Sequence, residues 1–165
     1  MIKIGILGDI GSGKSYIAKN FGYPVFNADE EVRKLYKRNK KIFIKLKKVL
    51  PKFIYSFPIN KNEIIKAIFA NKINLKKITK IIHSEIRKEM NKFLKKHINK
   101  KIVILDIPLL LENKINKKED ILVFVKSNKK DILKRLKKRP GFNYNLFIKF
   151  KKIQLPLDYK MKKSH

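Results

Sequence analysis

The sequence of 165 residues predicts an α/β protein built on a parallel sheet. Four short runs of β-branched and apolar residues have the length of strands, and stretches with apolar residues at helical spacing lie between them. A glycine-rich turn directly follows the first run. Runs this apolar are typical of strands buried on both faces, as in a parallel sheet covered by helices.

The predicted strands are Ile2–Leu7, Pro24–Asn27, Ile102–Ile107 and Ile121–Val125. The predicted helices are Lys14–Phe21, Glu30–Arg38, Lys129–Lys138 and a long central block from about Lys61 to His97. Because the central block contributes no strand, we expect a helical insert over about residues 30–100 of a single domain spanning residues 1–165.

The turn after the first predicted strand is Gly8-Asp9-Ile10-Gly11-Ser12-Gly13-Lys14-Ser15, which fits the phosphate-loop pattern G-x-x-x-x-G-K-[ST]. Its glycines let consecutive backbone N–H groups face phosphate oxygens, and the following helix directs its positive end at the same anion. Lys14 is expected to reach the β- and γ-phosphates, and the Ser15 hydroxyl is expected to bind Mg²⁺. The sequence therefore predicts a site for a nucleoside triphosphate with Mg²⁺.

The remaining sequence favours a nucleotide or metabolite kinase among the proteins that carry this loop. A GTPase would need the guanine-reading pattern N-K-x-D after a strand, and Ile121–Val125 is followed by Lys-Ser-Asn-Lys-Lys. ATP-driven motors are usually larger than 165 residues. A short chain with a helical insert fits a kinase best.

Carboxylates lie at the carboxyl ends of the second and third predicted strands. Asp29 could accept the proton of an attacking hydroxyl, and it could equally cap the helix that begins there. Asp106 could complete a Mg²⁺ shell, or it could form an ordinary strand-end turn before Pro108. Both lie where the carboxyl ends of parallel strands gather their functional side chains.

Two of the five arginines, Arg135 and Arg139, lie in one basic stretch after the fourth predicted strand. Phosphoryl transfer needs cations that close over the transferring group, and arginine offers phosphate a forked, bidentate contact. We therefore expect a lid over about residues 134–155. The alternative for each arginine is a solvated helix face.

Taken in order, these pieces resemble the dephospho-coenzyme A kinase family over residues 2 to about 165. The matching segments are the phosphate loop, Asn27-Ala28-Asp29 with Arg33, Ile68-Phe69, His83-Ser84-Glu85-Ile86-Arg87, Asp106-Ile107-Pro108-Leu109-Leu110-Leu111-Glu112, Arg135 with Arg139, and Gln154-Leu155-Pro156 with Lys160. The segment of the pattern D-x-P-L-L-x-E discriminates most, because the phosphate loop alone is widely shared.

The resemblance implies a P-loop kinase fold with three layers (α/β/α), and transfer of the γ-phosphoryl group of ATP to the ribose 3′-hydroxyl of dephospho-coenzyme A. Asp29, Lys14, Arg135 and Arg139 fall on its catalytic positions. The implied ATP-binding residues are Gly8, Gly11, Ser12, Gly13, Lys14, Ser15 and Tyr16. The implied acceptor-binding residues are Asp29, Arg33, His83, Arg87, Asp106, Pro108, Leu109, Leu110 and Glu112. For His83, a packed helix histidine remains the alternative.

The sequence departs from the family pattern in several places. Asn27 replaces an aspartate, Ser84 a proline and Tyr16 a common threonine, and Asp9 puts a carboxylate where the loop usually has glycine. Family members also continue into a fifth strand and a last helix, so four strands are expected here. Without the fifth strand we expect an unpaired sheet edge at Ile121–Val125, and an inactive truncated homologue is an alternative.

The net charge of +30 raises the alternative of a nucleic-acid-binding protein. Lys, Ile and Asn account for 78 of the 165 residues, a bias that an AT-rich genome produces in proteins of any function. The lysines are also spread along the whole chain, so we expect no specific nucleic-acid partner.

With no cysteine, no apolar run of membrane-spanning length and no leader, we expect a cytoplasmic monomer or weak homo-oligomer. A further alternative to a dephospho-coenzyme A kinase is a P-loop kinase whose acceptor is another nucleoside or nucleotide.

Overall fold

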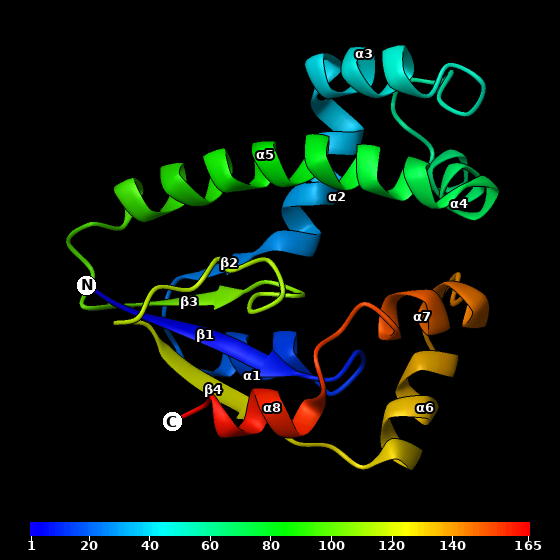
Figure 1. Cartoon of the computed structure of the whole chain (residues 1–165). Coiled ribbons are helices and arrows are strands. Elements are labelled where there is room, and N and C mark those ends of the chain that lie inside the picture. Colours follow the sequence, from blue (N-terminus) through cyan, green and yellow to red (C-terminus); the bar gives the residue numbers. More distant parts are fainter. The chain divides into compact units, whose positions relative to one another are not determined.

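A computed structural model describes all 165 residues (Figure 1). The chain divides into two compact units. The sheet unit comprises residues 1–27 and 97–165, and the helical unit comprises residues 28–96. The elements in chain order are β1 Ile2–Gly8, α1 Lys14–Asn20, β2 Val25–Asn27, α2 Ala28–Arg38, α3 Lys40–Val49, α4 Lys61–Ala70, α5 Lys72–Lys96, β3 Ile102–Asp106, β4 Ile121–Val125, α6 Lys129–Lys137, α7 Tyr144–Lys151 and α8 Leu157–Lys162.

The sheet unit contains a parallel four-stranded sheet with the order β2-β3-β1-β4, which confirms the predicted fold class. Side chains alternate between its faces, so Ile4, Ile6 and Ile104 pack with Ala18 of α1. On the other face Gly5 leaves room for Leu110, because a Cβ atom at residue 5 would lie only 2.6 Å from the Cδ2 atom of Leu110. This packing fixes the carboxyl ends of the central strands.

The expectation of an unpaired edge at β4 is wrong at Leu122. The backbone N–H of His165 donates to the Leu122 carbonyl at 2.8 Å, and the Leu122 N–H donates to His165 Nδ1 at 3.1 Å. The backbone groups of this edge residue are therefore satisfied by the last residue of the chain, which follows α8.

The helical unit is held together by α5, which contacts α2, α3 and α4. The buried apolar residues of all four helices recur at helical spacing, as expected for amphipathic helices. They include Leu35, Ile42, Leu46, Ile64, Ile68, Ile78, Ile82 and Ile86. The central block is broken at Asn71, whose side chain accepts from the N–H of Ile73 at 2.8 Å and so caps α5. None of the helices is both long and apolar enough to cross a membrane.

Candidate active site

The phosphate loop links β1 to α1 and is shaped by its glycines. Gly8, Gly11 and Gly13 have φ angles of 144°, 83° and 98°, a region that residues with a side chain rarely adopt. A Cβ atom at Gly8 would lie 2.7 Å from Ser12 Oγ, and one at Gly11 would lie 2.9 Å from Leu136 Cγ. Glycine is therefore required at both positions by backbone conformation and by space.

The loop fits a triphosphate in its polar groups as well. The Ser12 hydroxyl is buried and has no hydrogen-bond partner, so it is a polar group available to a ligand oxygen. Lys14 Nζ donates to the backbone carbonyls of Asp9 at 2.6 Å and Gly8 at 3.3 Å. Its ammonium group thus lies against the loop that is expected to hold the phosphates.

The Asp9 carboxylate, which stands where the loop usually has glycine, forms an ion pair. Its Oδ1 atom accepts from the N–H of Ile10 at 2.7 Å, and its Oδ2 atom lies 2.9 Å from Nζ of Lys151 in α7. Lys14 donates to the backbone carbonyl of the same residue, Asp9. The negative charge of Asp9 is therefore neutralised by Lys151.

Three polar side chains meet at the carboxyl ends of β2 and β3. Asn27 Nδ2 donates to Asp106 Oδ2 at 2.6 Å and lies 3.5 Å from Ser15 Oγ. Asp106 is 3% exposed, whereas Ser15 is exposed. A hydroxyl and a carboxylate are oxygen ligands of the kind that Mg²⁺ takes together with phosphate oxygens and water, so these residues fit that ion.

The two predicted lid arginines differ in their surroundings. Arg135, on α6, donates from Nη1 to the Ser12 carbonyl at 3.2 Å and to Ser127 Oγ at 3.0 Å. Arg139 follows the end of α6 and is exposed, and its guanidinium makes no hydrogen bond or ion pair. The structure thus places Arg135 on the phosphate loop and leaves Arg139 unengaged.

The segment after β3 is held by core packing and by a buried ion pair. Leu110 packs in the core, Leu109 adopts a left-handed φ of 57°, and Pro108 is exposed. Glu112 Oε1 lies 2.6 Å from Lys160 Nζ and accepts from the N–H of Leu155 at 2.9 Å. These contacts give Leu110 and Glu112 a role in the fold, and their contact with an acceptor stays a prediction.

The other predicted acceptor residues lie in the helical unit. Asp29 and Arg33 are exposed on α2 and line a cavity of about 630 Å³. The remaining lining residues are Val32, Tyr36, Lys37, Pro58, Ile59 and Lys61. Burial raises the pKa of Tyr36 to about 12, so its phenol stays protonated at neutral pH. This cavity combines one carboxylate with three cationic side chains.

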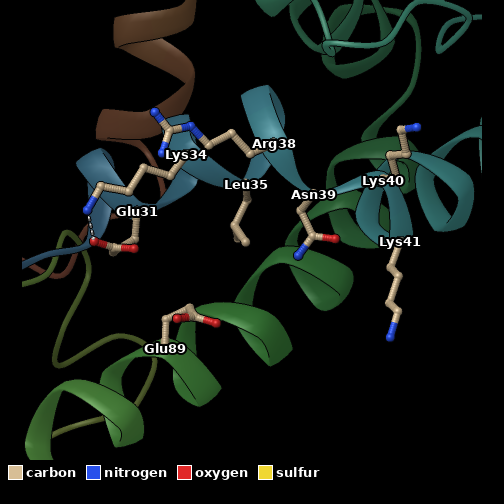
Figure 2. Close-up of a pocket in the computed structure, with 8 residues that line it drawn as sticks. All are labelled: Glu31, Lys34, Leu35, Arg38, Asn39, Lys40, Lys41 and Glu89. Atoms are coloured by element: carbon tan, nitrogen blue, oxygen red, sulfur yellow. Dashed lines mark hydrogen bonds and ion pairs between the residues drawn. The ribbon is translucent and has the colours of Figure 1, made fainter. Parts of the chain in front are cut away.

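A second cavity of about 430 Å³ lies between α2, the start of α3 and α5 (Figure 2). Figure 2 shows Glu31 of α2 and Glu89 of α5 among its lining side chains, and Glu31 pairs with Lys34 at 2.6 Å. Carboxylates therefore offset part of its positive charge. It also contains none of the predicted site residues, so the cavity with Asp29 and Arg33 is the better candidate for an acceptor.

His83 and Arg87 lie four residues apart on α5, which puts them on the same side of the helix. Partial burial lowers the pKa of His83, and the positive charge of Arg87 lowers it further. His83 is therefore mainly neutral at pH 7. The partial burial and lowered pKa of His83 fit a histidine that packs within the helical unit, and they equally fit a neutral imidazole that forms a hydrogen bond with a ligand.

Comparison with known proteins decides which kinase family these features belong to. The sequence profile of the dephospho-CoA kinase family matches residues 2–165. The chain belongs to the dephospho-CoA kinase family. The resemblance predicted from the sequence is thereby confirmed.

Similar proteins and solved structures cover nearly the whole chain. The dephospho-CoA kinase of Wolbachia sp. subsp. Brugia malayi is 34% identical over 98% of this chain and 85% of its own length. That of Bartonella quintana is 31% identical with the same coverage. The crystal structure of TT1252 from Thermus thermophilus is 26% identical, with a TM-score of 0.79 over 99% of this chain and 85% of that one. The dephospho-CoA kinase from Campylobacter jejuni is 20% identical with a TM-score of 0.62, which shows the shared fold.

The residues that sequence reasoning missed contact the candidate site without belonging to any of its sequence motifs. Lys151 pairs with Asp9 across 142 positions, and Ser127 holds Arg135. Lys151 is one of many lysines and lies outside the segments that match the dephospho-CoA kinase family. Tyr36 and Lys61 also line the cavity of Asp29. Tyr36 lies two turns after Asp29 on α2, so helical spacing could have placed it there, whereas only the fold brings Lys61 of α4 to this cavity.

Proposed function

We propose that this chain transfers the γ-phosphoryl group of ATP to the ribose 3′-hydroxyl of dephospho-CoA, giving CoA and ADP. The phosphate loop carries the proposal, because its glycines, the unpartnered Ser12 hydroxyl and Lys14 together fit a triphosphate. Membership of the dephospho-CoA kinase family supports the acceptor. The cavity lined by Asp29, Arg33, Lys37 and Lys61 supports an anionic acceptor with a reactive hydroxyl.

In this proposal the sheet unit binds the nucleotide. Lys14 leaves the Asp9 carbonyl and donates to the β- and γ-phosphates, and the loop N–H groups and Ser12 hold the remaining phosphate oxygens. Ser15, together with Asp106, would hold Mg²⁺, which when bound neutralises developing charge on the phosphates. Asn27 orients both residues.

The helical unit, as the insert of about residues 30–100, supplies the acceptor side. Arg33, Lys37 and Lys61 attract the diphosphate group of dephospho-CoA. Asp29 takes the proton from the 3′-hydroxyl as the hydroxyl oxygen bonds to the γ-phosphorus and the bond to the bridging oxygen of ADP breaks. Arg135 and Arg139, in a lid of about residues 134–155, offset the charge of the transferring group.

The test is ATP- and Mg²⁺-dependent phosphorylation of dephospho-CoA by this 165-residue chain, measured by mass spectrometry of the acceptor. Lys14→Ala is the control, and adenosine, AMP and other nucleosides serve as competing acceptors. We expect transfer to dephospho-CoA that Lys14→Ala abolishes. Preferred transfer to another acceptor would replace dephospho-CoA as the proposed acceptor, and no transfer to any acceptor would contradict a kinase activity of this chain.

The absence of cysteine is compatible with a cytoplasmic location, which stays a prediction.

A further inference from the structure

We propose that Lys151 is a positioning residue of the phosphate loop, and that its ion pair with Asp9 keeps the loop able to receive a triphosphate. This inference rests on the proposed function, since it concerns the ATP site. Lys151 ends α7, and Asp9 is the second residue of the loop. Their charged atoms lie 2.9 Å apart.

Asp9 places a negative charge where the loop is built to hold negative charge. Its side chain is 5% exposed, so water screens that charge poorly. Lys14, which is expected to reach the β- and γ-phosphates, donates to the carbonyl of this same residue at 2.6 Å. An unpaired carboxylate at Asp9 would therefore repel the phosphates and would also compete for Lys14.

The structure shows how this repulsion is avoided. Asp9 Oδ1 accepts from the N–H of Ile10, which keeps the carboxylate within its own turn, and Oδ2 accepts from Lys151 Nζ. Both acceptor atoms are engaged, so the carboxylate is turned toward α7. Lys151 is 43% exposed and also lies over the ring of Phe147 at 5.6 Å, a contact within its own helix that favours this position of the ammonium group.

The inference predicts a coupling between two residues that lie 142 positions apart. Lys151→Ala leaves the Asp9 carboxylate unpaired, and we expect the dissociation constant for ATP to rise by about tenfold. Asp9→Asn keeps an acceptor for the N–H of Ile10 but removes the charge, and we expect ATP to bind about threefold more tightly. The double variant then returns to within about twofold of the wild type, because it lacks both charges.

The experiment is isothermal titration calorimetry of ATP with the full chain at low ionic strength. Lys152→Ala is the matched control, because it removes an exposed positive charge from the next position. Lys151→Arg, which can keep the pair, should bind ATP like the wild type. Turnover at saturating ATP and the melting temperature without nucleotide are measured for every variant. A positioning role changes the ATP affinity and the KM for ATP, and leaves turnover at saturation within about twofold.

Two results would overturn the inference while leaving the kinase proposal intact. These are a double variant that binds ATP as weakly as Lys151→Ala, and a Lys152→Ala variant that loses as much affinity as Lys151→Ala. A wild-type chain that does not bind ATP overturns both proposals. The expected coupling together with no transfer to dephospho-CoA supports this inference and overturns only the acceptor.

Discussion

In the sheet unit the candidate ATP site is shaped mainly by the main chain, through three glycines with positive φ and a loop fixed between β1 and α1. In the helical unit the candidate acceptor cavity is lined by side chains on α2, by the loop before α4 and by the first residue of α4. A phosphate group is recognised by N–H groups that any sequence can supply once glycine permits the turn. A particular acceptor instead needs particular side chains, and Asp29 and Arg33 are exposed on α2, where a ligand can reach them.

This contrast explains why substitutions in the two units should separate nucleotide binding from turnover. Under the proposed function, changes on the loop or its supports should affect ATP binding, and changes on α2 should affect the acceptor.

Asp29→Asn should lower turnover by about 10³-fold, because general-base catalysis commonly contributes 10² to 10⁴. The affinity for ATP should stay within about twofold of the wild type, since Asp29 is proposed to act on the acceptor hydroxyl. Turnover is measured with dephospho-CoA and ATP affinity by calorimetry. Glu30→Gln, which removes a carboxylate from the same helical turn, is the control. An equal loss of turnover and ATP affinity would mean that Asp29 is structural.

Lys160→Met should destabilise the folded chain by about 3 kcal/mol, because it leaves the buried Glu112 carboxylate without its ion-pair partner. Urea unfolding provides the measurement. Lys162→Met removes an exposed lysine from the same helix and should change stability by less than about 0.5 kcal/mol. Adding Glu112→Gln should recover most of the loss. If the double variant is as unstable as Lys160→Met, the ion pair does not account for the effect.

Arg139→Ala should lower turnover by about 30-fold, because the guanidinium is expected to act on charge that develops during transfer. Its side chain is unengaged in this structure, so the substitution should leave the melting temperature unchanged. Lys138→Ala, at the neighbouring position, controls for the loss of positive charge. An unchanged rate for Arg139→Ala would remove this residue from the proposed site.

The smallest effect concerns His83, whose pKa is lowered by burial and by Arg87. Because its pKa in the folded chain is below the unfolded value of about 6.5, its stabilising contribution is complete above pH 6.5. That contribution is lost as the pH falls through the lower pKa of the folded state. The loss should be less than about 1 kcal/mol, since His83 is only partly buried. His83→Gln should remove this part of the pH dependence of unfolding, and a wild-type slope in the variant would contradict the assignment.

Much of the sheet unit could be predicted from the sequence, because local patterns decide it. The four strands begin and end within one residue of the predicted bounds, since each is an apolar run bounded by turn residues. The phosphate loop could also be predicted from the sequence, because its backbone conformation requires glycine at positions 8, 11 and 13.

Other features depended on contacts that a single sequence does not display. Helices α3, α7 and α8 were not predicted individually, since their apolar residues, such as Ile42 and Leu46 of α3, are separated by lysines. The break at Asn71 was hidden for a similar reason, because apolar residues continue at helical spacing on both sides of it. The pairs of Asp9 with Lys151 and of Leu122 with His165 join residues distant in sequence, so only the fold reveals them.

The most direct test of the division between the two units is to measure two dissociation constants, for ATP and for dephospho-CoA, in three proteins. These are the wild type, Lys14→Ala and Arg33→Ala. We predict that Lys14→Ala loses ATP binding by at least about 100-fold and keeps its affinity for dephospho-CoA. We predict that Arg33→Ala weakens dephospho-CoA binding by about tenfold and keeps its affinity for ATP. Loss of both ligands in either variant, or the opposite pattern, would contradict the assignment of nucleotide to the sheet unit and acceptor to the helical unit.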